Sequence, residues 1–375
     1  IQRTLKFVKY MRFFGWEPVI LTVENGEYPA IDPSLIQEIP DNIQVYKTKA
    51  FQPFQLYRML TGKKGNTHNN ANVFGQKDKT FVERLAKWIR LNLFIPDARI
   101  GWYAYAVKAA KKIIEQEHID LIYSSSPPHS LQLIAQKIAK QNKIKWVADF
   151  RDPWSELVHY QSYKRTWLTR KIDSHFEKSV FRSADRLVAA ANDYATCIKT
   201  HVDRKIEVIY NGYDPSDFPK PKSKNTEDFL ITYTGELSED RIPHALLRAL
   251  SRLEDSNIKL QFIGNTCPEL KQEIQQLNLG NKVILKPYMP HIASIAELQQ
   301  SDLLLLVINQ VANGKGIVPG KIFEYLGTRK PILCLGDPTG EAGEIIKTTN
   351  SGFCIAHHNE EEIFILLSRL SSGVT

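Results

Sequence analysis

Short apolar segments alternate with longer amphipathic stretches along all 375 residues. The short segments are rich in Val, Ile and Leu, a composition typical of strands buried on both faces of a parallel sheet. We expect strands at 18–23, 43–47, 120–124, 144–150, 186–190, 206–210, 229–234, 259–263, 283–285, 302–308, 331–335 and 352–355. The stretches between them, such as 104–116, 130–141 and 244–253, have the period of helices. Repeated β-α alternation predicts two doubly wound parallel α/β domains.

A polar segment divides this pattern into two halves. Residues 219–228 are charged, contain proline and lack periodicity, which is typical of a linker. We therefore expect an N-terminal Rossmann-like domain over 1–222 and a C-terminal one over 223–375. The chain opens on an amphipathic helix, 1–14, whereas such a domain ordinarily opens on a strand and a glycine turn. We expect that this first strand is missing and that the C-terminus is clipped as well.

Composition is that of a globular protein, with 43% hydrophobic and 24% charged residues. No apolar stretch approaches the ~18–20 residues of a membrane span. The four cysteines are scattered, without metal-site spacing or a C-x-x-C pair, which favours a reducing, cytoplasmic setting.

Charge distinguishes the two halves. Residues 1–222 hold 35 Lys and Arg against 23 Asp and Glu, whereas residues 223–375 hold 14 against 18. An excess of basic residues in the first half predicts an anionic partner, namely nucleic acid, a membrane surface or a phosphorylated acceptor. Neither a nucleic-acid-binding fold nor clustered base-stacking aromatics accompany it, so we expect no nucleic acid.

A basic amphipathic helix is predicted at 81–94, after a polar segment at 62–79 that we interpret as a mobile loop. In this helix apolar and basic residues interleave: Phe81, Leu85, Trp88, Ile89 and Leu93 with Arg84, Lys87 and Arg90. One interpretation is peripheral contact with the inner face of a membrane or with a lipid-linked acceptor. The other is a helix packed on its own domain with solvated charges.

Several well-known motifs are absent from the sequence. No G-x-G-x-x-G follows a strand, which argues against a nicotinamide dinucleotide. The glycines of 314–322 have the wrong spacing for a P-loop, and Ile322 stands where Ser or Thr would bind magnesium. There is no D-x-D pair, no G-x-S-x-G and no H-E-x-x-H. We expect neither a metal nor another cofactor.

Polar residues follow two predicted strands of the first domain, at the edge where open α/β sheets bind ligands. Asp149, Arg151 and Asp152 come at the end of strand 144–150, and we interpret them as functional; the alternative is that Arg151 neutralises Asp149. The serines of 124–130 allow a substrate to approach backbone N–H groups. There His129 either hydrogen-bonds a sugar or phosphate or simply begins the helix.

The turn at 234–241 follows the first strand of the second domain. Gly235 permits close approach of a ligand to the backbone, and the helix that follows favours an anion at its start. Arg241 can hydrogen-bond a phosphate in bidentate fashion. Alternatively, Glu239 or Asp240 caps the helix and pairs with Arg241.

The loop at 314–320 follows the buried strand 302–308. Three glycines and a proline give it exposed N–H groups, a geometry that cradles phosphates. Lys321 then stands near the start of a helix. Glu324 lies one turn in, where its carboxylate can accept two hydrogen bonds from a ribose diol. The alternative is a capping glutamate.

Five segments share their order and spacing with a known family. They are 149–154 (Asp-Phe-Arg-Asp-Pro-Trp), 184–188 (Ala-Asp-Arg-Leu-Val), 209–214 (Ile-Tyr-Asn-Gly-Tyr-Asp), 233–235 (Tyr-Thr-Gly) and 319–326 (Pro-Gly-Lys-Ile-Phe-Glu-Tyr-Leu). Through them almost the whole chain resembles the retaining glycosyltransferases of family 4, the group 1 glycosyltransferases. The resemblance implies a GT-B fold with its active site in the cleft between the domains, without a metal. The second domain would bind a nucleotide-sugar donor and the first the acceptor.

The resemblance also implies roles for individual residues. The glutamate of the family that holds the ribose matches Glu324, while its first motif glutamate, eight residues earlier, falls on Gly316. The arginine–lysine pair on the diphosphate falls on Glu236 and Arg241, so that Lys321 or Lys315 would replace the missing charge. The family's histidine in the first domain falls on Arg151.

The sequence therefore predicts a metal-independent glycosyltransferase of the hexosyltransferase type. It would transfer a sugar with retention from a nucleotide-diphosphate sugar to a lipid-linked, polysaccharide or other glycan acceptor of the cell envelope. Alternatives are a non-transferring, epimerase-like enzyme and a degenerate module that binds nucleotides or glycans. The candidate catalytic residues are Arg151, Asp152 and Arg241; donor-binding residues are Gly235, Glu236, Arg241, Gly264, Tyr288, Lys315, Gly316, Ile317, Val318, Pro319, Lys321 and Glu324; acceptor-side residues are His129, Asp149 and Asn211.

Overall fold

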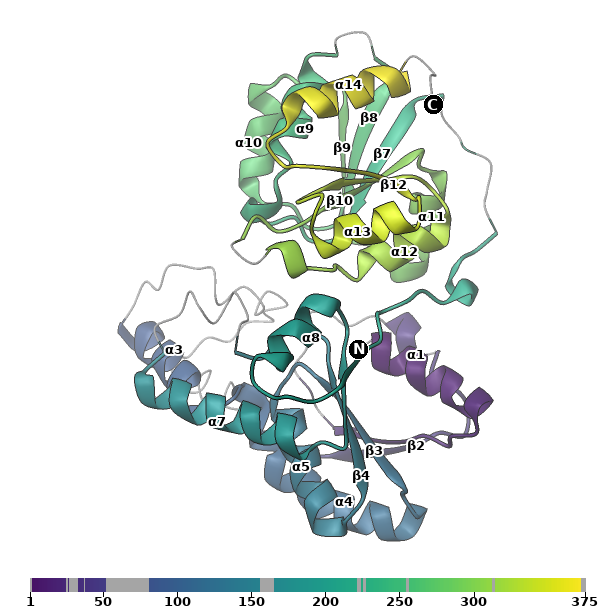
Figure 1. Cartoon of the computed structure of the whole chain (residues 1–375). Coiled ribbons are helices and arrows are strands. Elements are labelled where there is room, and N and C mark those ends of the chain that lie inside the picture. Colours follow the sequence, from purple (N-terminus) through teal and green to yellow (C-terminus); the bar gives the residue numbers. More distant parts are fainter. Residues whose placement is uncertain are drawn as a thin grey trace. The chain divides into compact units, whose positions relative to one another are not determined.

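The computed structural model of the chain divides into two compact units, Ile1–Tyr210 and Asn211–Thr375 (Figure 1). It describes residues 2–24, 26, 33–36, 38–51, 81–155, 165–220, 224, 227–253, 256–311 and 314–371. The loop predicted at 62–79 lies outside these residues, as does part of the predicted linker at 219–228. The domain boundary at 222 and 223 stays a prediction.

The first unit contains two parallel sheets. One pairs β1 (Val19–Val23) with β2 (Gln44–Thr48), and the other runs in the order β3 (Leu121–Ser126), β4 (Lys145–Phe150), β5 (Arg186–Ala189) and β6 (Ile206–Val208). Its α-helices are α1 (Gln2–Met11), α3 (Phe81–Leu93), α4 (Tyr103–Glu117), α5 (Ser130–Asn142), α7 (Trp167–Ser183) and α8 (Asn192–Lys199).

The core of the first unit lies between its sheet and its helices. Trp146 and Phe150 of β4 are almost fully buried, and Phe150 meets the ring of Phe181 on α7 edge to face. Small residues let α4 approach α5 closely, since Ala106 and Ala110 share one cluster with residues of α5. The amphipathic pattern of these helices thus places their apolar faces inward, as the period predicts.

The second unit is one parallel sheet in the order β12–β11–β10–β7–β8–β9. The strands are β7 (Phe229–Thr234), β8 (Ile258–Ile263), β9 (Val283–Lys286), β10 (Leu303–Val307), β11 (Ile332–Leu335) and β12 (Gly352–Ile355). The helices are α9 (His244–Ser251), α10 (Pro268–Gln276), α11 (His291–Gln300), α12 (Lys321–Thr328), α13 (Glu341–Thr348) and α14 (Glu360–Ser371). Every residue of β10 is buried, as its uninterrupted apolar sequence predicts.

The strand order of the second unit reverses at β7. The chain passes from β7 to β8 and β9 on one side and then returns to place β10 on the other side. Neighbouring loops at such a switch point leave in opposite directions, which opens a crevice at the carboxyl ends of the strands. The loops after β7 and β10 are those in which the candidate donor-binding residues cluster.

The predicted fold is confirmed. Each expected strand is present with its ends within two residues of the prediction. The opening helix is shorter than expected, because α1 ends at Met11 and a 3₁₀ turn, Arg12–Phe14, follows and closes on Gly15. Gly15 has a φ of 77°, a left-handed conformation that glycine adopts without strain. No helix within the described ranges is long and apolar enough to span a bilayer.

Candidate functional site

Two glycines shape the turn after β7. Gly235 has a φ of 112°, and a Cβ atom there would lie 2.8 Å from Nζ of Lys321. Gly264, after β8, has a φ of 129°, and its Cβ would lie 2.4 Å from the carbonyl oxygen of Gly235. The contact at Gly264 cannot be relieved by a small shift, because the obstacle there is backbone. The two glycines therefore let the turns pack together and leave room for the Lys321 side chain.

Lys321 begins α12, and its ammonium group lies at the end of β7. Nζ donates to the carbonyl oxygen of Thr234 at 2.5 Å and sits 3.9 Å from the centre of the Tyr233 ring. Helix α12 is held in place by Tyr325, whose buried hydroxyl accepts from the N–H of Thr234 at 3.2 Å and donates to the carbonyl of Leu305. The helix is thereby tied to both strands at the switch point, β7 and β10.

Arg241 ends a short 3₁₀ turn, Glu239–Arg241, in the same loop. Its Nε donates to Oδ1 of Asn309 at 2.9 Å, and one terminal nitrogen donates to the carbonyl of Glu236 at 3.4 Å. Asn309 in turn donates to Asp240 at 2.5 Å. The sequence left open that Arg241 pairs with Asp240, and the structure joins these two through the Asn309 amide instead.

Arg241 and Lys321 form a pair of cations whose hydrogen-bond partners, among the described residues, are uncharged. Their hydrogen-bond acceptors are carbonyl oxygens and an amide, and no described carboxylate lies within ion-pair distance of either. Burial lowers the pKa of Lys321 to about 7, the positive charge of Arg241 adds to this, and Glu324 opposes it. Two partly buried cations that repel each other are stabilised when an anion binds between them.

Glu324 of α12 is in contact with a histidine of α11. Its Oε1 lies 3.0 Å from Nε2 of His291, the first residue of α11, and both side chains are mostly buried. This contact fixes the direction of the Glu324 carboxylate one turn into α12. The alternative of a capping glutamate does not describe it, since the helix is preceded by Gly320 without a side-chain cap.

The loop after β10 leads from the end of that strand into α12. Gly314–Gly316 form a 3₁₀ turn in which Gly316 is buried, and Ile317, Val318 and Pro319 lead from it into α12. Lys315 points to the next loop, where Nζ lies 3.0 Å from Asp337 and 3.3 Å from Thr339. Hydrogen bonds from Thr339 and then from Lys315 lower the pKa of Asp337 to about 2. Lys315 is thus already neutralised, unlike Lys321.

The remaining donor-side candidates lie at the same edge of the second unit. Glu236 is exposed, and its carbonyl accepts from the Tyr233 hydroxyl at 2.8 Å. Tyr288 follows β9 and is 58% exposed. Asn211, an acceptor-side candidate, is the first residue of the second unit. Roles for these residues stay predictions.

The corresponding edge of the first unit is occupied by Asp149 at the end of β4. Its carboxylate is fully buried and accepts from Arg3 through two bonds of 3.0 and 2.8 Å, from Tyr123 at 2.8 Å and from Ser125 at 2.6 Å. Arg3 therefore neutralises Asp149, where the sequence offered Arg151. An acceptor-side role for Asp149 stays a prediction, and its own chain already fills its hydrogen-bonding capacity.

His129 and Arg151 also lie inside this unit. His129 is 1% exposed and stacks on Trp154 with ring centres 4.7 Å apart. Burial, followed by the charge of Arg151, lowers the pKa of His129 to about 3, so the ring is neutral at ordinary pH. Arg151 donates to the carbonyl of Pro127. The expected sugar or acceptor contacts of both residues stay predictions.

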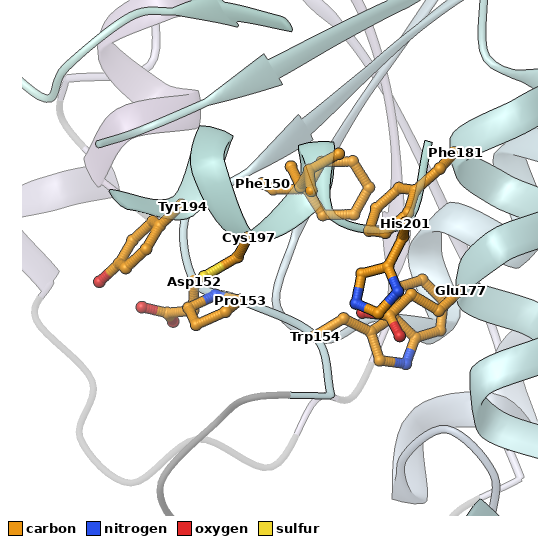
Figure 2. Close-up of a pocket in the computed structure, with 10 residues that line it drawn as sticks. Phe150, Asp152, Pro153, Trp154, Glu177, Phe181, Tyr194, Cys197 and His201 are labelled. Atoms are coloured by element: carbon orange, nitrogen blue, oxygen red, sulfur yellow. The ribbon is translucent and has the colours of Figure 1, made fainter. Parts of the chain in front are cut away.

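Asp152 lies beside a small hollow after β4 (Figure 2). Aromatic and aliphatic side chains form most of its wall, and Glu177 and His201 lie on the side away from Asp152. Burial raises the pKa of Glu177. The hollow holds about 10 Å³, the space of one water molecule. It is too small for a sugar ring as it stands.

Sequence reasoning missed two residues of the second unit, His291 and Asn309. Each follows a predicted strand, Asn309 directly and His291 after a short loop, so the strand-end rule that found Arg241 pointed to them as well. The sequence did not reveal their partners, which lie 33 residues away for His291 and 68 residues away for Asn309.

Among the residues with described positions, no three His, Cys, Asp or Glu side chains gather as a metal site requires.

Comparisons with known proteins agree with this architecture. The sequence matches two family models, Glycosyltransferase Family 4 over residues 71–217 and Glycosyl transferases group 1 over residues 215–372. No curated protein matches the sequence.

Solved structures share the fold at low sequence identity. A sucrose-phosphate synthase from Thermosynechococcus elongatus has a TM-score of 0.62 at 11% identity, over 98% of this chain and 82% of that one. A glycosyltransferase from Rickettsia africae has 0.59 at 15%, over 100% and 86%. Anabaena Alr3699/HepE, in complex with UDP and glucose, has 0.58 at 16%, over 99% and 86%. The two family matches, which together span residues 71–372, indicate a group 1 glycosyltransferase, and the architecture is that of the GT-B type.

Proposed function

We propose that the second unit binds a nucleotide-diphosphate sugar, with the diphosphate between Arg241 and Lys321. The observation that carries this proposal is the cation pair at the switch point of the sheet, whose acceptors among the described residues are neutral. A diphosphate supplies the negative charge that the pair lacks, and Arg241 can offer it two parallel N–H groups. Glu324, oriented by His291, accepts hydrogen bonds from the ribose diol.

The same groups account for catalysis of transfer. The bond between the sugar's anomeric carbon and the diphosphate oxygen breaks, and the diphosphate leaves with the electron pair. The acceptor hydroxyl bonds to the same carbon from the face the diphosphate leaves, which retains the configuration, and its proton passes to the leaving phosphate. Negative charge grows on the diphosphate, where Arg241, Lys321 and the N–H groups of 314–320 stabilise it. These side-chain cations support metal-independent transfer.

The first unit would then bind the acceptor, which is a glycan or a lipid-linked saccharide used for cell-envelope polysaccharide. Arg151 and Asp152 are the candidates for orienting it, because they follow β4 at the edge where such sheets bind ligands. The structurally similar Alr3699/HepE was solved with UDP and glucose, which makes UDP-glucose the first donor to test.

Thermal stability against nucleoside diphosphates and their sugars tests this function. A ligand that binds only the folded protein raises its melting temperature. We expect one nucleotide class to stabilise the wild type and to have little effect on Glu324→Ala. The stabilising donor is then incubated with lipid and glycan acceptors, and transfer is followed by mass spectrometry of the product. If no nucleotide of the panel stabilises the protein, the donor site is not where we place it.

One observation favours a second function, a module that binds nucleotide sugars without transferring the sugar. Gly316 stands where the family's first motif glutamate is expected, so this loop offers the sugar no carboxylate. A protein of that kind would bind the donor as above and release neither free sugar nor product. Donor consumption over time therefore separates the two functions.

A further inference from the structure

The exposed side of α7 carries charge of one sign. The helix contains two acidic residues, Asp173 and Glu177, and both are buried, at 3% and 2% exposure. Asp173 is neutralised internally by Arg165 at 2.5 Å. The basic residues of the helix lie on its outer side instead: Arg170, Lys171 and Arg182 are exposed, and Lys178 is partly exposed. The helix therefore presents a positive face to solvent.

Large apolar side chains stand at the first turn of the same helix. Trp167 is 68% exposed and Leu168 is 58% exposed. Lys171 lies one turn on, with Nζ 4.9 Å from the centre of the Trp167 ring. Packing among the described residues of the first unit does not explain these two residues, because the buried side of α7 begins with Thr169 and Asp173.

Helix α3 lies beside the start of α7 (Figure 1). Its residue Asn92 accepts from the N–H of Thr166 at 2.7 Å and from the hydroxyl of Thr169, which places the end of α3 beside the start of α7. Leu85, Trp88 and Leu93 of α3 are 45%, 46% and 64% exposed. The sequence left open whether the helix at 81–94 contacts a membrane or packs on its own domain. It gave no indication that the neighbouring face of α7 would take part in such a contact.

We propose that this α3–α7 surface docks on an anionic lipid bilayer. The surface comprises Leu85, Trp88, Leu93, Trp167 and Leu168, with Arg170, Lys171, Lys178 and Arg182 beside them. Tryptophan and leucine insert at the boundary of headgroups and acyl chains, and lysine and arginine extend their charged ends to anionic headgroups. Each basic side chain near such a surface adds to the attraction, and salt weakens that attraction.

Lipid fits this surface better than the other anionic partner, nucleic acid. Three of the five apolar residues are leucines, which gain from acyl chains and have no stacking face for bases. The two tryptophans lie on different helices next to these leucines. The docking surface is independent of the donor site, because all of its residues belong to the first unit and the cation pair belongs to the second.

Co-sedimentation with vesicles tests the proposal on the full chain. We expect binding to phosphatidylcholine vesicles that contain phosphatidylglycerol and much weaker binding to phosphatidylcholine alone. Trp167→Ala combined with Leu168→Ala should weaken binding by about tenfold or more, since each removes a large apolar group. Lys171→Glu combined with Arg170→Glu should weaken it by about tenfold or more and should flatten its salt dependence.

Matched controls lie in the second unit. Phe353→Ala removes a side chain that is 46% exposed, and Lys271→Glu reverses an exposed charge on α10, so neither should alter vesicle binding. Nucleotide-induced stabilisation should be equal in all these variants, which shows that they are folded. Equal binding to both kinds of vesicle, or equal loss in the controls, overturns the proposal. So does salt-sensitive binding of an oligonucleotide through the same residues without vesicle binding.

Discussion

The two units use the carboxyl ends of their strands in opposite ways. At the end of β4 the buried Asp149 receives hydrogen bonds from Arg3, Tyr123 and Ser125, so charge and hydrogen-bonding capacity are satisfied within the chain. At the ends of β7 and β10, Arg241 and Lys321 donate to neutral oxygens of the described residues and repel each other. The first arrangement stabilises the fold, and the second is the one that we propose to stabilise a bound diphosphate.

The difference shows how to separate structural from functional polar clusters. Both clusters were singled out because they follow buried strands, and that rule alone does not distinguish them. Charge balance does, because a saturated buried ion pair has no capacity left for a ligand, whereas an unbalanced pair of cations raises the energy of the empty protein. Substitutions on either side of this contrast should therefore separate an effect on stability from an effect on binding.

The largest effect is expected for Asp149→Ala. It leaves Arg3 charged and buried without its partner, and breaking a buried ion pair in this way costs about 3–5 kcal/mol of unfolding free energy. Urea unfolding measures the change. Glu207→Ala serves as the control, since the ion pair of Glu207 with Lys205 is largely exposed. A loss for Asp149→Ala no greater than that of the control would show that the cluster is not structural.

Arg241→Ala should act on binding and leave stability nearly unchanged. Loss of charge-assisted hydrogen bonds to the diphosphate costs about 1.5–3 kcal/mol, or about 10–100-fold in affinity for a nucleoside diphosphate. Isothermal titration calorimetry measures it. Arg248→Ala is the matched control, because Arg248 lies nearby in sequence on α9 and pairs with Glu360. Unchanged affinity in Arg241→Ala contradicts the phosphate role.

The low pKa of Lys321 predicts pH-dependent donor binding. Its pKa is about 7 in the empty protein, and a bound diphosphate raises it, so binding takes up a proton above pH 7. Affinity for a nucleotide sugar, whose phosphates do not titrate here, should fall about eightfold from about pH 6.5 to about pH 8. Lys321→Met should bind weakly at both pH values, and a pH dependence that survives in this variant rules out Lys321 as its source.

The same pKa sets the sign of a stability effect. Because the folded value lies below the unfolded one, the charged form of Lys321 is disfavoured by folding. Its cost is fully present below pH 7 and is relieved as pH rises toward about 10. In the empty protein, Lys321→Met should therefore raise the melting temperature more at low pH than at high pH, which differential scanning calorimetry can follow.

The smallest effect is expected for His291→Ala, which removes the partner of Glu324 without touching the phosphate site. Affinity for a nucleoside diphosphate should fall by about three- to tenfold, the range of a single hydrogen bond, while affinity for inorganic diphosphate stays the same. His291→Gln, which can still donate, should restore most of the loss. An equal fall for inorganic diphosphate would mean that His291 supports the whole site rather than the ribose carboxylate.

Much of the fold could be read from the sequence. The strands were visible because a parallel sheet covered on both faces demands continuous apolar segments, as in the wholly buried β10. Lys321 and Glu324 could be named because a glycine-rich loop after a strand leads directly into their helix.

Long-range pairing could not be read in this way. Arg3 and Asp149 are 146 residues apart, and Arg3 lies in a helix whose periodicity marks it only as amphipathic. The sequence offered Arg151 for Asp149 because it is the nearest cation along the chain. Periodicity reports which side chains are buried, whereas the partner of a buried charge depends on how distant elements pack.

The central claim is that Arg241 and Lys321 act together on one diphosphate. We would measure UDP affinity by calorimetry for the wild type, Arg241→Ala, Lys321→Met and the double variant at about pH 6.5, where Lys321 is charged. The account predicts that each single variant loses most of the affinity and that the double variant loses less than the sum of the two free-energy changes, because the two cations share one ligand. Wild-type affinity in either single variant, or strictly additive losses, would contradict it.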